Sequence, residues 1–577
     1  MRLSKKFTTT ALPALLCILA MLVAACGGGG AGQTGNSSSS GKTKASADKQ
    51  VLRYPVIGDV TSIDPANDQD TDSDFIVQAA FVGLVGLDDN LAVKMNLASD
   101  YKVSSDNLTY TFTLKPNLKF ADGNPLTADD VAYSINRTVL PATKSVVSTY
   151  LSLIKGYDKV SAGKQASLIG DGLIVKDPNT IAITITKPAP YFLQTLAYPT
   201  SFVVEKAMVE KYTKADGSTT YTDHLNDGGT SGPFKVVSYS HTTGFELVPN
   251  ENFFGDKPQI QHLSIPFFKD YQGTYSAYQA HQVDFTILPP DNVATERSNP
   301  AFKETPRLTI RYAAMNYLVK PFDNSKIRQA FALAIDKNLI VQSALSGTFT
   351  PSNHVIPSGM QGYYPDLKGP DGTASTGANT AMAKQLLQEG MQEAGYANAA
   401  ALPPITLTFY PRSTGMKNAE TAMVQMWQNT LGVSVKTQIV TRSQAIKLTN
   451  ATRGNGSLQM WIAGWNSDYP DPQDWLSTFF EKGVDYNQAN YGQNNSANAA
   501  AQQAVQDELL KADGTQDPAA RMKLYNDAEQ KIITDTGWIS LWQEKVQSLT
   551  RPTVQGLVLN AQLQIPQTDW ANIYISQ

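Results

Sequence analysis

Hydrophobic and polar residues along this chain of 577 residues follow two different periods. In TIAITIT (180–186) and YTFTL (110–114) they alternate with a period of two, which predicts β-strands. The segment ADDVAYSINRT follows Thr127, which can cap a helix, and Asp130 stands where a capping box places its acid. Strands and helices are therefore both expected.

Two further segments carry the apolar spacing of a helix that packs on a core. One runs over residues 519–533 after the start signal Asp517-Pro518. Its apolar stripe consists of Met522, Tyr525, Ala528 and Ile532. The apolar face of the other consists of Ile327, Ala330, Phe331, Ala334 and Ile335. Because no short repeat is visible, we predict a mixed α/β protein and not a solenoid or an all-β shell.

The N-terminus has the pattern of a secretory signal peptide, predicted for residues 1–25. Arg2, Lys5 and Lys6 precede an uncharged run that ends in small residues at Ala25, and its apolar core is short for a membrane-spanning helix. Residues 22–27, LVAACG, resemble the lipobox of bacterial lipoproteins. Cys26 is then the expected lipidation site, and it anchors the protein on the extracytoplasmic face of the membrane. The alternative is an ordinary secreted protein with a stray thiol.

Residues 26–50 are expected to be the lipidated cysteine and a flexible Gly/Ser linker. The linker contains Gly41-Lys42-Thr43, the end of a phosphate-binding loop, but Asn36 stands where that loop needs its first glycine. Removal of the signal leaves 44 basic and 51 acidic residues, a net charge of −7. This charge argues against nucleic acid as a partner.

Sequence motifs of common enzymes are absent. There is no G-x-S-x-G, no H-E-x-x-H and no complete phosphate loop, and the five histidines are widely spaced. We therefore predict a protein that is not an enzyme and has neither cofactor nor bound metal. An extracellular hydrolase remains the alternative from another functional class, and it would need a nucleophile or metal that no motif marks.

Residues 464–480, GWNSDYPDPQDWLSTFF, combine three acids with five aromatic rings. Asp471 precedes Pro472 as a helix cap, and Asp474 falls in the first turn, where the helix dipole favours an acid. Simple packing is the expected role of Trp475, Phe479 and Phe480. The remaining acid, Asp468, has no such structural explanation, which suggests a place for a charged guest.

Several segments in the same order resemble the family-5 extracellular solute-binding proteins that serve peptide ABC transporters. These are SIDPANDQDTDSDFIVQAAFVGLVGLDD, LASDYKVSSDNLTYTFTLKPNLKFADGNPLTADDVAYSINR, GTSGPFKV, ENFFGDKP, VDFTILP, MNYLVKPFDNSKIRQAFALAIDKNLI and GWNSDYPDPQDWL. The resemblance runs from about Val51 to Leu559. It implies a two-lobed α/β fold of the periplasmic-binding-protein type, hinged between the lobes. The implied segments are 51–82, 228–306 and 543–577 for lobe I, 83–227 for an inserted subdomain, and 307–542 for lobe II.

The resemblance also implies the site. In Trp465-Asn466-Ser467-Asp468, the acid of a W-x-x-D motif would pair with the α-ammonium group of a peptide; Trp465 would wall that end and Tyr469 would shape the surface beside it. Arg412 lies near the position of an arginine that binds the ligand carboxylate in dipeptide binders, or is an exposed structural arginine. Gly229, Thr230 and Ser231 form either a cleft edge for main-chain contacts or a tight turn.

The predicted function is therefore capture of peptides between two closing lobes and their delivery to the permease subunits of an ABC importer. We expect a monomer. Other cargoes of the family are the alternatives within this class: an oligosaccharide, a nickel complex or haem. Asp468 separates peptides from neutral sugars, because a sugar offers it no cation.

Overall fold

The computed structural model describes residues 42–57, 62–68, 71–215 and 217–577. Residues 43–577 form one compact unit. The predicted signal peptide and Cys26 lie outside the described residues. The linker was predicted to continue to Gln50, but Gln50 is buried and its side chain donates to the carbonyl oxygens of Ala45 and Ile575, each at 2.9 Å. The chain is therefore bound to its C-terminal strand before β1 begins.

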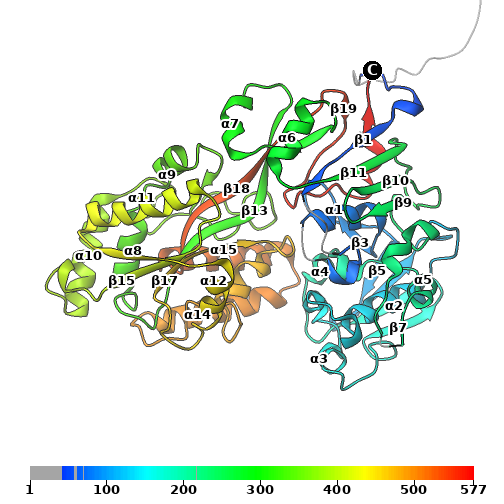
Figure 1. The fold of residues 1–577 in the computed structure, drawn as a ribbon. Coiled ribbons are helices and arrows are strands. Elements are labelled where there is room, and N and C mark those ends of the chain that lie inside the picture. Colours follow the sequence, from blue (N-terminus) through cyan, green and yellow to red (C-terminus); the bar gives the residue numbers. More distant parts are fainter. Residues whose placement is uncertain (1–41, 58–61, 69–70, 216) are drawn as a thin grey trace, which may run out of the picture. The chain divides into compact units, whose positions relative to one another are not determined.

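A mixed sheet of seven strands is the largest of the described part. Its order is β12-β18-β13-β17-β15-β16, and the short β14 pairs with β18. The strands are β12 (Phe285–Ile287), β13 (Phe302–Met315), β14 (Thr350–Pro351), β15 (Ile405–Phe409), β16 (Val435–Ile439), β17 (Met460–Asn466) and β18 (Ile539–Thr550). The long strands β13 and β18 are antiparallel and lie side by side (Figure 1). β15 is parallel to both β16 and β17.

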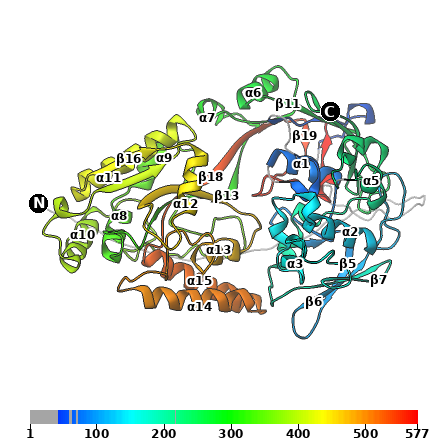
Figure 2. The same cartoon turned by 60° about the horizontal axis from the view of Figure 1, so that its bottom comes forward.

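Successive residues of this sheet pack on opposite faces, as a period of two requires. Along β13, Ala313 and Met315 belong to one core cluster, whereas Tyr312 and Ala314 belong to another. The first cluster is covered by α8 (Ser325–Leu333), α9 (Lys337–Ala344), α10 (Thr380–Ala394) and α11 (Thr414–Leu431). The second is covered by α13 (Leu476–Phe480), α14 (Ala499–Gly514) and α15 (Pro518–Thr534). Figure 2 shows α11 and α14 on opposite sides of these strands.

The remaining strands form smaller sheets. A five-stranded sheet contains β1 (Val51–Arg53), β2 (Val56–Ile57), β9 (Phe234–Ser240), β10 (Gly244–Pro249) and β11 (His262–Phe268). A four-stranded sheet contains β5 (Ala98–Val103), β6 (Thr109–Leu114), β7 (Leu173–Asp177) and β8 (Thr180–Thr184). Two hairpin-like pairs are β3 (Val85–Leu87) with β4 (Val93–Met95), and β19 (Val554–Gln555) with β20 (Tyr574–Ile575). The mixed α/β class predicted from the sequence is thus confirmed.

The other helices lie mainly in the first half of the chain, and α12 lies in the second. They are α1 (Thr71–Ala80), α2 (Ala128–Val139), α3 (Tyr157–Ser161), α4 (Phe192–Leu196), α5 (Lys206–Lys211), α6 (Tyr271–Gln279), α7 (Pro290–Glu296) and α12 (Arg442–Asn450). As predicted, α2 begins after Thr127, whose backbone N–H donates to Asp130 Oδ2 at 2.9 Å. α15 is capped by Asp517. α8 ends at Leu333, so Ala334 and Ile335, which were predicted on its apolar face, are buried just beyond the helix.

The segments predicted for the lobes map onto different sheets. The five-stranded sheet uses residues of 51–82 and 228–306, and the four-stranded sheet lies within 83–227. The predicted limits of lobe II, 307 and 542, fall inside β13 and β18. These two long strands therefore connect residues assigned to both lobes, which is the place that a hinge would occupy. The limits themselves stay a prediction.

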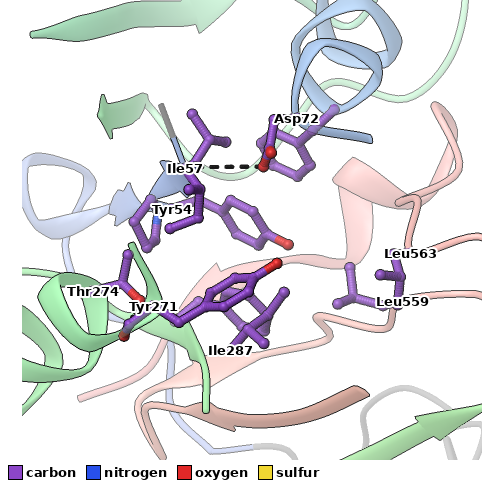
Figure 3. A pocket seen from close by; sticks show the side chains of 12 residues that line it. Tyr54, Ile57, Asp72, Tyr271, Thr274, Ile287, Leu559 and Leu563 are labelled. Carbon is purple, nitrogen blue, oxygen red and sulfur yellow. Dashed lines mark hydrogen bonds between the residues drawn. The ribbon is translucent and has the colours of Figure 1, made fainter. Parts of the chain in front are cut away.

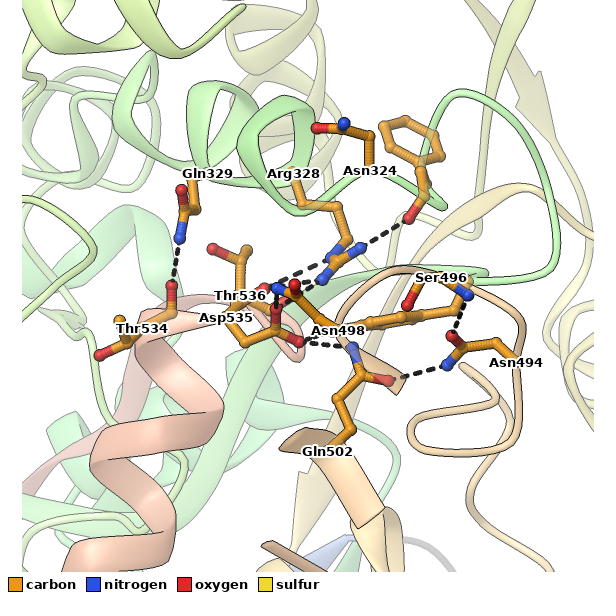
Figure 4. Close-up of polar contacts among 12 residues, drawn as sticks. Asn324, Arg328, Gln329, Asn494, Ser496, Asn498, Gln502, Thr534, Asp535 and Thr536 are labelled. Atoms are coloured by element: carbon orange, nitrogen blue, oxygen red, sulfur yellow. Dashed lines mark hydrogen bonds and ion pairs between the residues drawn. The ribbon is translucent and has the colours of Figure 1, made fainter. Parts of the chain in front are cut away.

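A buried polar network surrounds Arg328 of α8 (Figure 4). Arg328 is fully buried; its Nη2 lies 2.9 Å from Asp535 Oδ1, and its Nη1 donates to the Phe322 carbonyl at 2.8 Å. Asn498 and Gln502 donate to the same carboxylate at 3.0 and 2.8 Å. Because the buried charges are paired and hydrogen-bonded, this network joins α8, α14 and α15 and is not a ligand site.

Candidate functional site

A cavity of about 410 Å³ is lined by two segments that are far apart in the chain. One wall comes from residues 149–195, and the other comes from residues 465–486 at and beyond the end of β17. Three of the predicted site residues, Trp465, Asp468 and Tyr469, line it. The volume lies in the range of roughly 300–1,000 Å³ that is usual for small-ligand sites.

The turn after β17 is held by the carboxylate of Asp474. Its Oδ2 accepts from the backbone N–H of Asp468 at 2.9 Å, from Trp465 Nε1 at 3.2 Å and from Ser467 Oγ at 3.2 Å. Burial, and next the nearby charge of Asp468, raise the pKa of Asp474 well above its usual value. Asp474 therefore fixes both the indole and the backbone of the candidate anchor.

Asp471 has a structural role, as its position before Pro472 predicted. It is completely buried, and its Oδ1 accepts from the Gln473 backbone N–H at 2.9 Å. The guanidinium group of Arg521 binds both carboxylate oxygens, with Nη1–Oδ2 at 2.8 Å and Nη2–Oδ1 at 2.5 Å. This two-point pair joins the turn to α15 and neutralises the acid.

Asp468 is only half-buried and faces the cavity. Within the described ranges it forms no ion pair with a lysine or arginine; its side-chain partner is the hydroxyl group of Tyr150. Burial raises the pKa of Asp468 to about 6, and the hydrogen bond from Tyr150 opposes that rise. A carboxylate in this state gains from a cation that brings its own hydrogen-bond donors.

Aromatic rings form much of the wall around Asp468. Trp465 packs edge-on against Phe479 and Tyr486, each with ring centres 5.0 Å apart. Across the cavity, Tyr469 stacks on Tyr191 with ring centres 6.0 Å apart and an angle of 4° between the planes. These rings offer flat apolar surface beside the carboxylate.

The predicted packing roles are confirmed. Trp475, Phe479 and Phe480 are 0%, 6% and 2% exposed and belong to the core cluster under α13–α15.

Arg412 lies apart from this cavity wall. Its guanidinium group forms an ion pair with Glu544 of β18, and Glu544 also faces the buried Arg311 at 3.8 Å. The structural alternative given from the sequence fits this arrangement, because the charge of Arg412 already has a fixed partner.

Residues Gly229, Thr230 and Ser231 are not brought together with Asp468. Thr230 and Ser231 are 0% and 2% exposed. Ser231 Oγ accepts from the Val82 N–H at 3.2 Å and donates to the Val203 carbonyl at 2.7 Å. The backbone of Thr230 and Ser231 is bonded to Ala121 and Ala80. The tight-turn alternative fits these contacts better than an open cleft edge.

Two other cavities are less suitable as binding sites for a charged ligand. One beside Tyr54, Tyr271 and Asp72 measures about 40 Å³, a tenth of the candidate site (Figure 3). Another measures about 570 Å³, but its buried Asp64 is paired with Arg137 Nη1 at 2.9 Å and accepts from the Tyr221 hydroxyl at 3.0 Å. The charge of Asp64 is therefore already balanced.

The sequence did not identify the residues of the opposite wall. Tyr150, Lys187 and Tyr191 lie in a segment that carries no recognisable motif, and only the fold brings them to Asp468. The described part of the chain contains no group of three or more His, Cys, Asp or Glu side chains that could hold a metal ion. None of the helices among these same residues is both long and apolar enough to cross a membrane.

Comparison with known proteins places the chain among binding proteins. It is 27% identical over 460 residues to the oligopeptide-binding protein OppA of Bacillus subtilis (strain 168), covering 78% of this chain and 81% of that protein. It is 28% identical over 520 residues to the glutathione-binding protein GsiB of Escherichia coli (strain K12), covering 86% and 89%.

Solved structures show the same fold. The murein tripeptide-binding protein MppA in its unliganded open form has a TM-score of 0.76 at 24% identity, over 93% of this chain and 99% of that one. Haemophilus influenzae OppA in complex with RPPGFSPFR has a TM-score of 0.66 at 22% identity, over 92% and 99%. The two-lobed α/β fold expected from the sequence is thereby confirmed.

The profile of the bacterial extracellular solute-binding proteins, family 5 Middle, matches residues 92–487, which is more than half of the chain. This chain therefore belongs to the family-5 bacterial extracellular solute-binding proteins.

Proposed function

We propose that this protein captures peptides by pairing Asp468 with their free α-ammonium group and passes them to the permease of an ABC importer. Substrate capture for a transporter is the function of its family, and its relatives are binding proteins. Those named above are described as binding oligopeptides and glutathione. Peptides are accordingly the cargo class that we assign to this chain.

The observation that carries this proposal is the state of Asp468. It is a half-buried carboxylate whose pKa burial raises to about 6, and the Tyr150 hydroxyl is the partner found for its side chain within the described residues. An ammonium group offers a positive charge and three N–H donors. Pairing would therefore supply the charge and hydrogen bonds that water supplies to the empty site.

Asp474 and the rings complete the proposed amine site. Because Asp474 holds the Asp468 backbone and the Trp465 indole, the carboxylate needs little rearrangement when a ligand arrives. The ring of Trp465 would cover the ligand backbone beside the ammonium group, with Tyr469 next to it. Hydroxyl groups of Thr149, Ser152 and Thr186 on the opposite wall suit hydrated side-chain contacts.

We further propose that the protein is not an enzyme and acts as a monomer on the extracytoplasmic face of the membrane, anchored through lipid on Cys26. Replacement of Cys26 by serine would then release the protein into the medium or periplasm without changing peptide affinity. Retention of the Cys26→Ser protein in the membrane fraction would contradict the lipid anchor.

Calorimetry with trialanine, followed by mass spectrometry of the recovered peptide, tests the function. We expect saturable binding and recovery of the intact peptide. Cleavage would favour the hydrolase. Binding of neutral oligosaccharides without binding of peptides would favour a glycan receptor, for which the rings of Trp465 and Tyr469 are suitable surfaces. Mass spectrometry of cargo that co-purifies with the protein identifies the natural ligand.

A further inference from the structure

Lys187 belongs to the cavity wall formed by residues 149–195, and Asp468 belongs to the other wall, formed by residues 465–486. It follows β8, and the backbone around it is fixed, because Thr186 N–H donates to the Leu153 carbonyl at 2.9 Å and Pro188 comes next. The side chain is exposed. A cation is thus presented to the cavity from a defined backbone position.

Lys187 carries its charge near two acids from the second half of the chain. Its positive charge acts on Glu481 and on Asp513, lowering the pKa of each against the larger effect of burial. Asp513 already accepts hydrogen bonds from Ser477 Oγ and the Tyr525 hydroxyl, both at 2.6 Å. Within the described ranges Lys187 forms neither an ion pair nor a hydrogen bond, and neither of these acids lines the cavity.

Two arginines of the second half of the chain are already paired with acids. Arg412 is paired with Glu544, and Arg521 is paired with Asp471. Among the described residues that line the cavity, Lys187 is the one cationic side chain; of the two acids there, Asp474 is buried in its turn and Asp468 is half-exposed. The cavity therefore has a negative pole and a positive pole within about 410 Å³.

We propose that Lys187 binds the terminal carboxylate of a short peptide whose ammonium group is held by Asp468. This inference rests on the proposed peptide function. A ligand held at both poles is a zwitterion, and three extended residues span at most about 10 Å. The cargo class is accordingly di- and tripeptides with both ends free. Arg412 then has no part in carboxylate binding, and Lys187 sets the length of the ligand.

The test is a double-mutant cycle between the protein and the peptide end, measured by calorimetry on the soluble Cys26→Ser protein. The ligands are trialanine, trialanine amide and pentaalanine. The proteins are the parent, Lys187→Gln, and the matched control Lys164→Gln, in which an exposed lysine outside the cavity is changed. We expect amidation to weaken binding to the parent by about tenfold or more.

Lys187→Gln should weaken the binding of trialanine by the same factor and leave the affinity for trialanine amide unchanged. Lys164→Gln should change neither affinity. Trialanine should bind the parent more tightly than pentaalanine. If Lys187→Gln weakened the binding of trialanine and of trialanine amide equally, Lys187 would serve contact between the walls and the inference would be overturned. The inference would also be overturned if the parent bound trialanine and trialanine amide with the same affinity. Failure of all three peptides to bind the parent would overturn the proposed function itself.

Discussion

Asp468 and Asp471 lie in the same turn, but their carboxylates differ in whether a cation of the protein is paired with them. Asp471 is fully buried, and Arg521 binds both of its oxygens. Asp468 is half-buried beside the cavity, with the Tyr150 hydroxyl as its side-chain partner in the described part of the chain. The protein itself supplies the cation that pairs with Asp471, whereas a bound ligand would supply the cation for Asp468.

This difference separates a structural acid from a binding acid. A buried pair contributes little net free energy, but removal of one partner leaves an uncompensated charge. Asp471 and Arg521 should therefore matter for folding and little for ligand choice. Asp468 should matter for ligand choice and little for folding, since water reaches it when the cavity is empty.

The largest expected effect is on stability. Arg521→Leu leaves Asp471 buried without its cation and should lower the free energy of unfolding by about 3–5 kcal/mol. Urea denaturation followed by circular dichroism measures it. The matched control is Lys523→Leu on the same helix, whose exposed ammonium group pairs with Asp527 and whose loss should change little. If both variants unfolded at the same urea concentration, the structural role of the Asp471 pair would be wrong.

Glu529 extends the comparison because it is a buried acid that is bound by backbone N–H groups. It is fully buried, and its Oε1 accepts from the N–H groups of Val355 and Ile356 at 2.8 and 2.9 Å. Burial is the main cause that raises the pKa of Glu529 to about 7. Since the folded state then binds more protons than the unfolded state, the stabilising effect is full below about pH 4.5 and is lost as the pH rises through 7.

Glu529→Gln keeps the acceptor oxygen and removes this titration. Relative to the parent, the variant should gain about 3 kcal/mol of stability between pH 4.5 and pH 8, because the pKa of Glu529 is about 7 in the folded protein and 4.5 ordinarily. Urea denaturation at the two pH values measures the difference. A constant difference between the two proteins across that range would show that Glu529 does not titrate as described.

A smaller effect concerns the pH dependence of peptide binding. The pKa of Asp468 is about 6 in the empty site, and a bound ammonium group lowers it because opposite charges favour ionisation. Binding therefore releases a proton below pH 6, and the affinity should fall as the pH decreases, by about tenfold between pH 6 and pH 5 at most. Calorimetry in buffers of different ionisation enthalpy reports both changes. An affinity that rises on acidification would contradict this account.

Local patterns in the sequence predicted the local parts of the fold. The cap at Thr127, the start of α15 at Asp517 and the buried face of α8 depend on neighbouring residues, and they were predictable. The role of Asp471 as a cap was predictable for the same reason. Its pairing with Arg521 was not, because the two residues meet only after the sheet and α15 have packed together.

The candidate site shows the same limit. Trp465 and Asp468 lie in one short motif, so the sequence alone could suggest them as a pair. Tyr150 and Lys187 come from a distant segment with ordinary composition, and nothing local indicates that they face that motif. Gly229–Ser231 illustrates the reverse case, since a segment rich in small residues suggested a cleft edge and lies in a buried turn. Contacts between distant segments depend on topology, which local periodicity does not specify.

The most direct test of the central claim combines a change in Asp468 with a change in the peptide amine. Calorimetry would compare trialanine and N-acetyl-trialanine on the parent and on Asp468→Asn. We expect acetylation to cost the parent about 2 kcal/mol or more and the variant almost nothing, since the lost charge pair is the same in both cases. Equal costs of acetylation in the two proteins would show that Asp468 does not bind the ammonium group.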